Sequence, residues 1–188
     1  AISGAANAAL TAPTPERISG ANRYATAVAV SKLMPATCDY VIASGENFPD
    51  GLAAAVYSQP ILLTQSAALP AETKAELDRL VGTVATPGPS AVPASVEAEL
   101  KGAIGVPTVT RLQGSDRAAT AVAITKAINA PNGGPLTNPG SVVLVNGFGF
   151  ADALAAGPYA RQQDGGAGAN IMLVGSTTVP AATAAYHS

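Results

Sequence analysis

One stretch of this chain occurs twice, and this repetition restricts the possible folds more than any other feature. Residues 17–32 read RISGANRYATAVAVSK, and residues 111–126 read RLQGSDRAATAVAITK, a match without a gap. A second block, residues 41–54, returns as residues 143–156. Similar blocks that recur in the same order are typical of tandem structural units. The sequence therefore predicts two copies of one folding unit.

The distance between matching blocks grows along the chain. It is 94 residues for the first block and 102 for the second, and it reaches 110 for the short apolar block 60–64, which returns as 170–174. The added residues fall in the turn-rich segment 131–135 and the glycine-rich segment 164–169. Insertions that fall in loops, while the elements stay aligned, are expected of structural repeats.

The same alignment assigns the two ends of the chain. Residues 1–10 align with residues 91–100, where we expect the last helix of a complete copy. We therefore predict that residues 1–16 are the tail of an upstream copy. Residues 17–110 then form a complete copy, and residues 111–188 form a second copy that stops before its closing elements.

Apolar periodicity predicts alternating helices and short strands within each copy. In the complete copy, helices are expected at 22–34, 49–58, 71–81 and 90–103, and strands at 40–43, 61–63, 83–86 and 109–112. The strand Ile61, Leu62 and Leu63 is wholly apolar, as in parallel sheets covered on both faces. This pattern indicates a layered α/β fold with short, mostly parallel strands and a core strand at Ile61–Leu63.

Composition excludes several classes of protein. Hydrophobic residues make up 48% and charged residues 12% of the chain, and the net charge of -2 provides no basic surface for nucleic acid. The most apolar stretch, 142–160, is interrupted by Asn146, Asp152 and Pro158, so we interpret it as core and not as a membrane span. Cys38 is the only cysteine, which excludes a disulfide within the chain and a cysteine-based metal cluster.

The repeated blocks resemble the type 2 cell-wall-binding repeat of Gram-positive surface proteins. The resemblance covers nearly the whole chain and is carried by Arg17-Ile-Ser-Gly, Arg23-Tyr-Ala-Thr-Ala, Ala43-Ser-Gly, Phe48-Pro-Asp50, Leu52-Ala-Ala and Pro60-Ile-Leu-Leu-Thr64. It implies tandem Toprim-like α/β modules, usually three copies around a pseudo-threefold axis. It also implies an extracellular, wall-bound protein that is held non-covalently by an anionic wall polymer.

The resemblance further implies a neighbouring effector domain, such as an N-acetylmuramoyl-L-alanine amidase, a protease or an adhesin. This chain departs from the family pattern at three points. The usual Gly-Gly turn is Pro87-Gly88, Tyr24 becomes Ala118 in the second copy, and Leu62 becomes Met172. Binding is therefore expected to differ between the copies.

Charged residues recur at matching positions of the two copies. They are Arg17, Arg23 and Asp50 in the first copy and Arg111, Arg117 and Asp152 in the second. One interpretation is that each aspartate pairs with an arginine and fixes a loop. The other is that the arginines donate bidentate hydrogen bonds to phosphate or carboxylate groups of the polymer. Ser44 and Asn146 stand between a strand and a helix, where backbone N–H groups can hold an anion.

Three functions remain open: a polymer-binding anchor, a scaffold repeat without a ligand, and a Mg-dependent hydrolase of the Toprim type. Glu46 corresponds to Phe148, so only Asp50 and Asp152 are retained between copies, a thin basis for two-metal chemistry. His187 is the only histidine and lies at the truncated end of the second copy, so we do not expect a histidine-based triad or a zinc amidase centre. We therefore predict a non-catalytic anchor without metal or cofactor, whose partners are an anionic wall polymer and further repeats.

Overall fold

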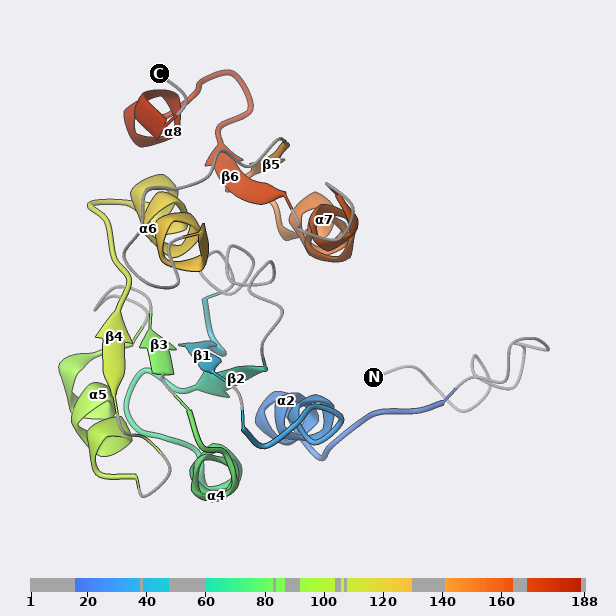
Figure 1. Cartoon of the computed structure of the whole chain (residues 1–188), viewed down its shortest axis with the longest axis vertical. Coiled ribbons are helices and arrows are strands. Elements are labelled where there is room, and N and C mark those ends of the chain that lie inside the picture. The colour runs from blue at the N-terminus through green and yellow to red at the C-terminus, as the bar shows by residue number, and fades with distance from the viewer. Residues whose placement is uncertain are drawn as a thin grey trace.

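The computed structural model describes residues 16–37, 39–47, 60–82, 84–86, 92–103, 106, 108–129, 141–163 and 169–186. Within these ranges the chain forms helices and short strands that all pair in parallel, in two separate sheets (Figure 1). This confirms the predicted α/β fold with short parallel strands. The helix predicted at 49–58 lies outside the described residues.

The first copy is built on a four-stranded sheet of order β2-β1-β3-β4. Its elements are α2 (Arg23–Ser31), β1 (Tyr40–Ser44), β2 (Ile61–Thr64), α4 (Ala71–Arg79), β3 (Val84–Thr86), α5 (Ala94–Lys101) and β4 (Val109–Arg111). All five residues of the central strand β1 are buried. The core joins β1 and β2 to α4 and α5 through Ile42, Leu62, Leu77 and Leu100, each with no exposed surface.

The second copy has a two-stranded sheet among the described residues. Its elements are α6 (Arg117–Asn129), β5 (Val142–Asn146), α7 (Phe150–Gln162), β6 (Asn170–Val174) and α8 (Ala181–Tyr186). Strand β6 is buried and contacts all three helices. The core of this copy includes Ile124, Ile171 and Leu173.

Leu112 connects the two copies. It directly follows β4 and packs against Val41 and Ala85 in the first sheet. It also packs against the core of the second copy. Leu112 belongs to the segment between β4 and α6, through which the chain passes from the first sheet to the second copy (Figure 1). The two cores are therefore joined by an apolar side chain as well as by the backbone.

The first helix of each copy begins with the same cap. Asn22 Oδ1 accepts a hydrogen bond from Ala25 N at 2.8 Å, and Asp116 Oδ1 accepts one from Ala119 N at 2.8 Å. A side-chain oxygen in this position satisfies an N–H group that has no partner inside the helix. The change from asparagine to aspartate keeps this function, because both residue types present the same oxygen.

A glycine before each of these helices is required by close packing. A Cβ atom at Gly20 would lie 2.5 Å from the Ala25 Cβ, and one at Gly114 would lie 2.2 Å from the Ala119 Cβ. Both distances are far below any real carbon contact, so only glycine fits at either position without a shift of the backbone. The repeated SG and QG dipeptides therefore have a steric cause.

A threonine in α4 and its counterpart in α8 bind the preceding strand. Thr73 Oγ1 donates to Leu63 O at 2.7 Å, and Thr183 Oγ1 donates to Leu173 O at 3.0 Å. Both threonines are buried, with exposed fractions of 0% and 1%. Each copy therefore fixes this helix to its strand with the same buried hydrogen bond.

The three predicted helices that lie within the described residues of the first copy are all shorter in the structure. Helix α2 ends at Ser31 and not at Met34, and Leu33 is 62% exposed in the turn that follows. Helix α5 begins at Ala94 because Pro93 is its N-cap residue. Proline is tolerated at a helix start but has no N–H group for the helix interior, which explains the later start.

Candidate functional site

The loops that leave β1 and β5 hold the same arginine contact. Arg23 Nη1 donates a hydrogen bond to Gly45 O, and Arg117 Nη1 donates to Gly147 O at 2.6 Å. Each arginine is the first residue of its helix, so the two helices present the guanidinium to the carboxyl end of the neighbouring strand. This site recurs in both copies. It joins the arginine of the first repeated block to the glycine of the second repeated block.

The loop glycines are themselves held by the adjacent strand. Gly45 N donates to Thr64 O at 2.8 Å, and Gly147 N donates to Val174 O at 2.9 Å. The N–H and C=O groups of each glycine are therefore both engaged. The arginine is anchored to a loop whose position is fixed by the sheet.

Ser44 and Asn146 each stabilise the turn that follows their strand, by accepting hydrogen bonds from backbone N–H groups of that turn. The Ser44 Oγ accepts hydrogen bonds from Glu46 N at 3.1 Å and Asn47 N at 3.0 Å. The Asn146 Oδ1 accepts one from Phe148 N at 2.9 Å. The backbone N–H groups of Glu46, Asn47 and Phe148 thus have side-chain acceptors in the structure. A polymer contact by Ser44 or Asn146 stays a prediction.

Arg111 occupies a different environment from Arg117. It forms an ion pair with Glu97, with the Nε atom 2.8 Å from Oε2, and its Nη1 donates to Val92 O at 2.9 Å. Hydrogen bonds from Lys101 and then Arg111 lower the pKa of Glu97 below its ordinary value. Arg111 therefore joins β4 to α5. Arg17 lies exposed ahead of α2.

The structure describes the side chains of only some of the remaining predicted residues. Asp50 lies outside the described residues, and Asp152 lies in α7, where its side chain is not among those described. Pairing of either aspartate with an arginine stays a prediction. In the apolar strand motif, Leu62 has no exposed surface, whereas Ile61 and Leu63 are half-buried.

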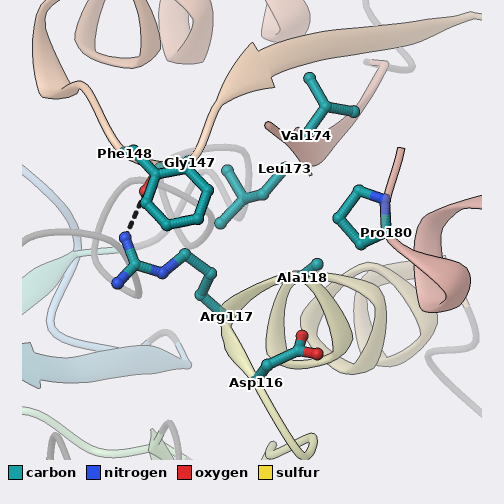
Figure 2. A pocket seen from close by; sticks show the side chains of 8 residues that line it. All are labelled: Asp116, Arg117, Ala118, Gly147, Phe148, Leu173, Val174 and Pro180. Carbon is teal, nitrogen blue, oxygen red and sulfur yellow. Dashed lines mark hydrogen bonds between the residues drawn. The ribbon is translucent and has the colours of Figure 1, made fainter. Parts of the chain in front are cut away.

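The two sites differ in the side chains around the shared contact. In the first copy the Tyr24 ring lies so close to Gly45 that a Cβ on the glycine would be 2.6 Å from Tyr24 Cε1. The second copy has Ala118 in place of Tyr24. There a cavity of about 310 Å³ is bordered by Arg117, Ala118, Gly147 and Leu173 (Figure 2).

The next loop residue also changes character. Glu46 Oε2 accepts a hydrogen bond from Ser66 N at 3.1 Å in the first copy. Its counterpart Phe148 is 69% exposed, and the Arg117 guanidinium carbon lies 4.6 Å from the centre of its ring. This distance is typical of a cation–π contact. Both substitutions are visible in the sequence. The cavity between the two residues could be recognised only from the positions of the loops in the structure.

A groove between two helices also recurs. It lies between α2 and α4 with a volume of about 440 Å³, and between α6 and α8 with about 370 Å³. Lys32 borders the first groove and Lys126 the second. In the first groove the negative charges of Glu72 and Glu76 balance the positive charges of Lys32 and Arg79, so its surface is less favourable for an anion than Lys32 alone indicates.

Over the part of the chain that the structure covers, no three His, Cys, Asp or Glu side chains are grouped so that they could hold a metal ion. Over the same part, no helix combines the length and apolar character needed to cross a membrane.

Comparison with protein families decides the classification. The model of the family described as Cell wall binding domain 2 (CWB2) matches residues 17–97 and 111–187. The chain belongs to the CWB2 family. This confirms the resemblance drawn from the repeated blocks, and the chain is a cell wall binding module with two CWB2 matches.

Individual relatives agree with this classification. The chain is 33% identical over 175 residues to the N-acetylmuramoyl-L-alanine amidase LytC of Bacillus subtilis (strain 168), covering 89% of this chain and 32% of LytC. The structure is similar to those of Cwp6 and Cwp8 from Clostridium difficile, both at 28% identity. The TM-scores are 0.72 for Cwp6, over 95% of this chain and 29% of that one, and 0.73 for Cwp8, over 88% and 28%. The CWB2 chain thus spans about a third of the length of these relatives.

Proposed function

We propose that this CWB2 module tethers a larger protein to the outside of the cell by binding an anionic wall polymer, and that Arg23 and Arg117 make the main contacts. The observation that carries the proposal is the repeated arginine-to-loop contact. A guanidinium has five N–H donors, so one bond to a loop carbonyl orients the group without using its other donors. The charge and its planar geometry suit phosphate and carboxylate groups.

Two arginine sites on one chain suit a repetitive polymer. Each exposed charge contact contributes only about 0.2–1 kcal/mol, because water and salt screen it. Two copies on one chain raise the effective concentration of the second contact once the first has formed. Weak contacts in tandem therefore support stable retention, and additional repeats in the same protein increase it further.

The other predicted residues take supporting roles in this proposal. Ser44 and Asn146 shape the two loops, and Arg111 joins β4 to the helix before it through Glu97. Arg17 adds positive charge ahead of the first site. Asp50 and Asp152 remain candidates for fixing the arginines. The proposed module has no catalytic role of its own.

The proposed wider arrangement follows the family resemblance. It consists of Toprim-like modules in a pseudo-threefold group, in which a further copy stands beside the two in this chain, and an effector such as an amidase, a protease or an adhesin is attached. The amidase relative supports an enzymatic effector, since this chain matches only 32% of that protein.

The test is retention on purified cell walls at increasing salt concentration. The double variant Arg23→Gln, Arg117→Gln is compared with Lys32→Gln, Lys126→Gln, which removes the same charge from matching positions in the grooves. We expect the arginine variant to lose about tenfold in affinity, and the lysine variant to bind like the unchanged chain. Binding should weaken with salt, because exposed charges are screened over about 8–10 Å near physiological ionic strength.

Circular dichroism separates loss of binding from loss of folding. If the folded arginine variant keeps full wall affinity, its arginines only hold the loops, and the scaffold interpretation replaces the proposal. If the lysine variant loses as much affinity as the arginine variant, the polymer is recognised by general charge or in the grooves, and the site assignment is wrong.

A further inference from the structure

Phe148 presents an aromatic ring to the solvent beside the arginine site of the second copy. It is 69% exposed, and no other large hydrophobic side chain that the structure describes is more exposed. The Arg117 guanidinium carbon lies 4.6 Å from the centre of the ring, and Figure 2 shows the two groups side by side. Covering an apolar ring that stands in water lowers the free energy, so this surface favours contact with a ligand.

The loop after β5 holds this ring in place. Phe148 N donates a hydrogen bond to Asn146 Oδ1 at 2.9 Å, and Gly147 N donates one to Val174 O at 2.9 Å. The Arg117 guanidinium adds a cation–π attraction to the ring. A side chain that is already ordered loses little conformational entropy when a ligand covers it, so a contact on its exposed surface is favourable.

The first copy has a carboxylate at the same loop position. The counterpart of Phe148 is Glu46, whose Oε2 accepts a hydrogen bond from Ser66 N at 3.1 Å. A carboxylate repels an anionic polymer, whereas an uncharged ring does not. At this position the second copy therefore places an apolar surface next to its arginine, and the first copy places a negative charge there.

The closeness of the ring and the guanidinium restricts the chemistry of the ligand. Because they lie 4.6 Å apart, an anionic group on Arg117 and a group on Phe148 must belong to the same or neighbouring units of a polymer. A sugar ring has C–H groups on its faces and hydroxyl groups at its rim. It can therefore cover an aromatic surface and leave its hydroxyl groups in water, which avoids the cost of burying them. A polyol phosphate chain has no such flat face.

We infer that Phe148 is a platform for a sugar ring, and that the anionic polymer bound at the second copy is therefore a glycan. The inference rests on the polymer site proposed for Arg117. The anionic group of the glycan binds the guanidinium, and the sugar ring that carries or adjoins this group covers Phe148. The first copy contacts the same polymer through Arg23 without this platform.

Retention of the whole chain on purified cell walls tests the platform. Phe148→Ala removes the ring, and we expect it to lower wall affinity by about fivefold, because the sugar ring then covers less apolar surface. Phe148→Trp keeps an aromatic ring and should bind at least as well as the unchanged chain. The control is Tyr159→Ala, which removes the ring of a residue that is 59% exposed on α7 and should leave wall affinity unchanged.

Salt separates the platform from an indirect effect through Arg117. An apolar contact is not screened, so the loss caused by Phe148→Ala should persist as the sodium chloride concentration rises, whereas the loss caused by Arg117→Gln should shrink. If folded Phe148→Ala keeps full wall affinity while Arg117→Gln loses it, the platform is refuted and the polymer site stands. If folded Arg117→Gln keeps full affinity, the polymer site itself fails, and the inference fails with it.

Two soluble polymers test the chemical class of the ligand. Polygalacturonate carries its carboxylates on sugar rings, and polyglutamate carries carboxylates without sugars. In a calorimetric titration we expect Phe148→Ala to weaken polygalacturonate binding by about fivefold and to leave polyglutamate binding unchanged. Equal weakening for both polymers would show that the ring acts only by holding Arg117. Failure of the unchanged chain to bind polygalacturonate more tightly than polyglutamate would exclude a glycan. Either result overturns the inference.

Discussion

The two copies share the hydrogen bonds that position their elements but differ in the side chains near the arginine site. Helix caps, threonine-to-strand bonds and arginine-to-loop bonds recur with nearly equal distances. By contrast, Tyr24 and Glu46 become Ala118 and Phe148. The backbone geometry therefore tolerates replacement of both side chains. The surface that each copy presents can change while the helices and strands keep their positions.

A second difference lies between the helices that flank the grooves. In the first copy Ser31 Oγ donates to the buried Glu76 at 2.7 Å, and Arg79 lies 2.6 Å from the same carboxylate. The matching positions in the second copy are Thr125 and Tyr186. A buried charge in one copy is thus replaced by an uncharged pair in the other, which makes the stability of the first copy more sensitive to pH.

The largest effect is expected in the core strands. Leu62→Ala in β2 and Met172→Ala in β6 each remove a side chain with no exposed surface. We expect each to lower the free energy of unfolding by about 2–5 kcal/mol, measured by urea denaturation, because a large-to-small change leaves a cavity. A loss below about 1 kcal/mol for Met172→Ala alone would show that the second core is packed more loosely than the first.

A smaller effect is expected for the charge found only in the first copy. Glu76→Gln should cost about 1–3 kcal/mol at pH 7, since it weakens hydrogen bonds from Arg79 and Ser31 to a buried group. Burial acts to raise the pKa of Glu76, but the hydrogen bonds and charges of Arg79, together with Ser31 and Lys32, lower it overall. Asp78→Asn, on the exposed side of the same helix, is the control.

The pH dependence of this variant follows from the lowered pKa. A depressed carboxyl pKa contributes stability above the unfolded value of about 4.3, and this contribution is lost as the pH falls through the folded value. The unchanged chain should therefore lose more stability between pH 7 and pH 3 than Glu76→Gln. Parallel acid profiles for the two proteins would show that Glu76 does not contribute to this pH dependence.

The smallest effect is expected for the repeated threonine bond. Thr73→Val and Thr183→Val keep the side-chain shape but remove the donor to Leu63 O or Leu173 O. Each should lower the free energy of unfolding by about 1 kcal/mol, the usual net value of one hydrogen bond, in a chemical denaturation series. Unequal losses would indicate that the two helices are held differently despite matching geometry.

The sequence predicted most of the helices and strands. The repeat aligns two versions of each element, whereas the apolar pattern of one copy alone can leave helix and strand ambiguous. Strands at Tyr40 and Ile61 and the helix at Ala71 begin where periodicity placed them. Helix ends were less predictable, because the start of α5 depends on Pro93 and the end of α2 on a turn after Ser31.

The candidate site was predicted less completely than the helices and strands. Matching blocks identified Arg23 and Arg117, but their acceptors are backbone carbonyls 22 and 30 residues away, for which side-chain patterns carry no signal. The partner of Arg111, Glu97, stands on a different element and was not identified. The cavity beside Ala118 depends on how α6 packs against β6 and on where the loop after β5 lies, which the substitution from tyrosine alone does not reveal.

The most direct test of the account is wall retention by the two single variants, Arg23→Gln and Arg117→Gln, beside the double variant. If both copies contribute equivalent contacts, the singles should show similar losses of about threefold each, and the double variant should lose about tenfold, as independent contributions combine. If one single variant accounts for the whole loss, or if all three folded variants bind walls like the unchanged chain, the central claim that both arginine sites bind the polymer is contradicted.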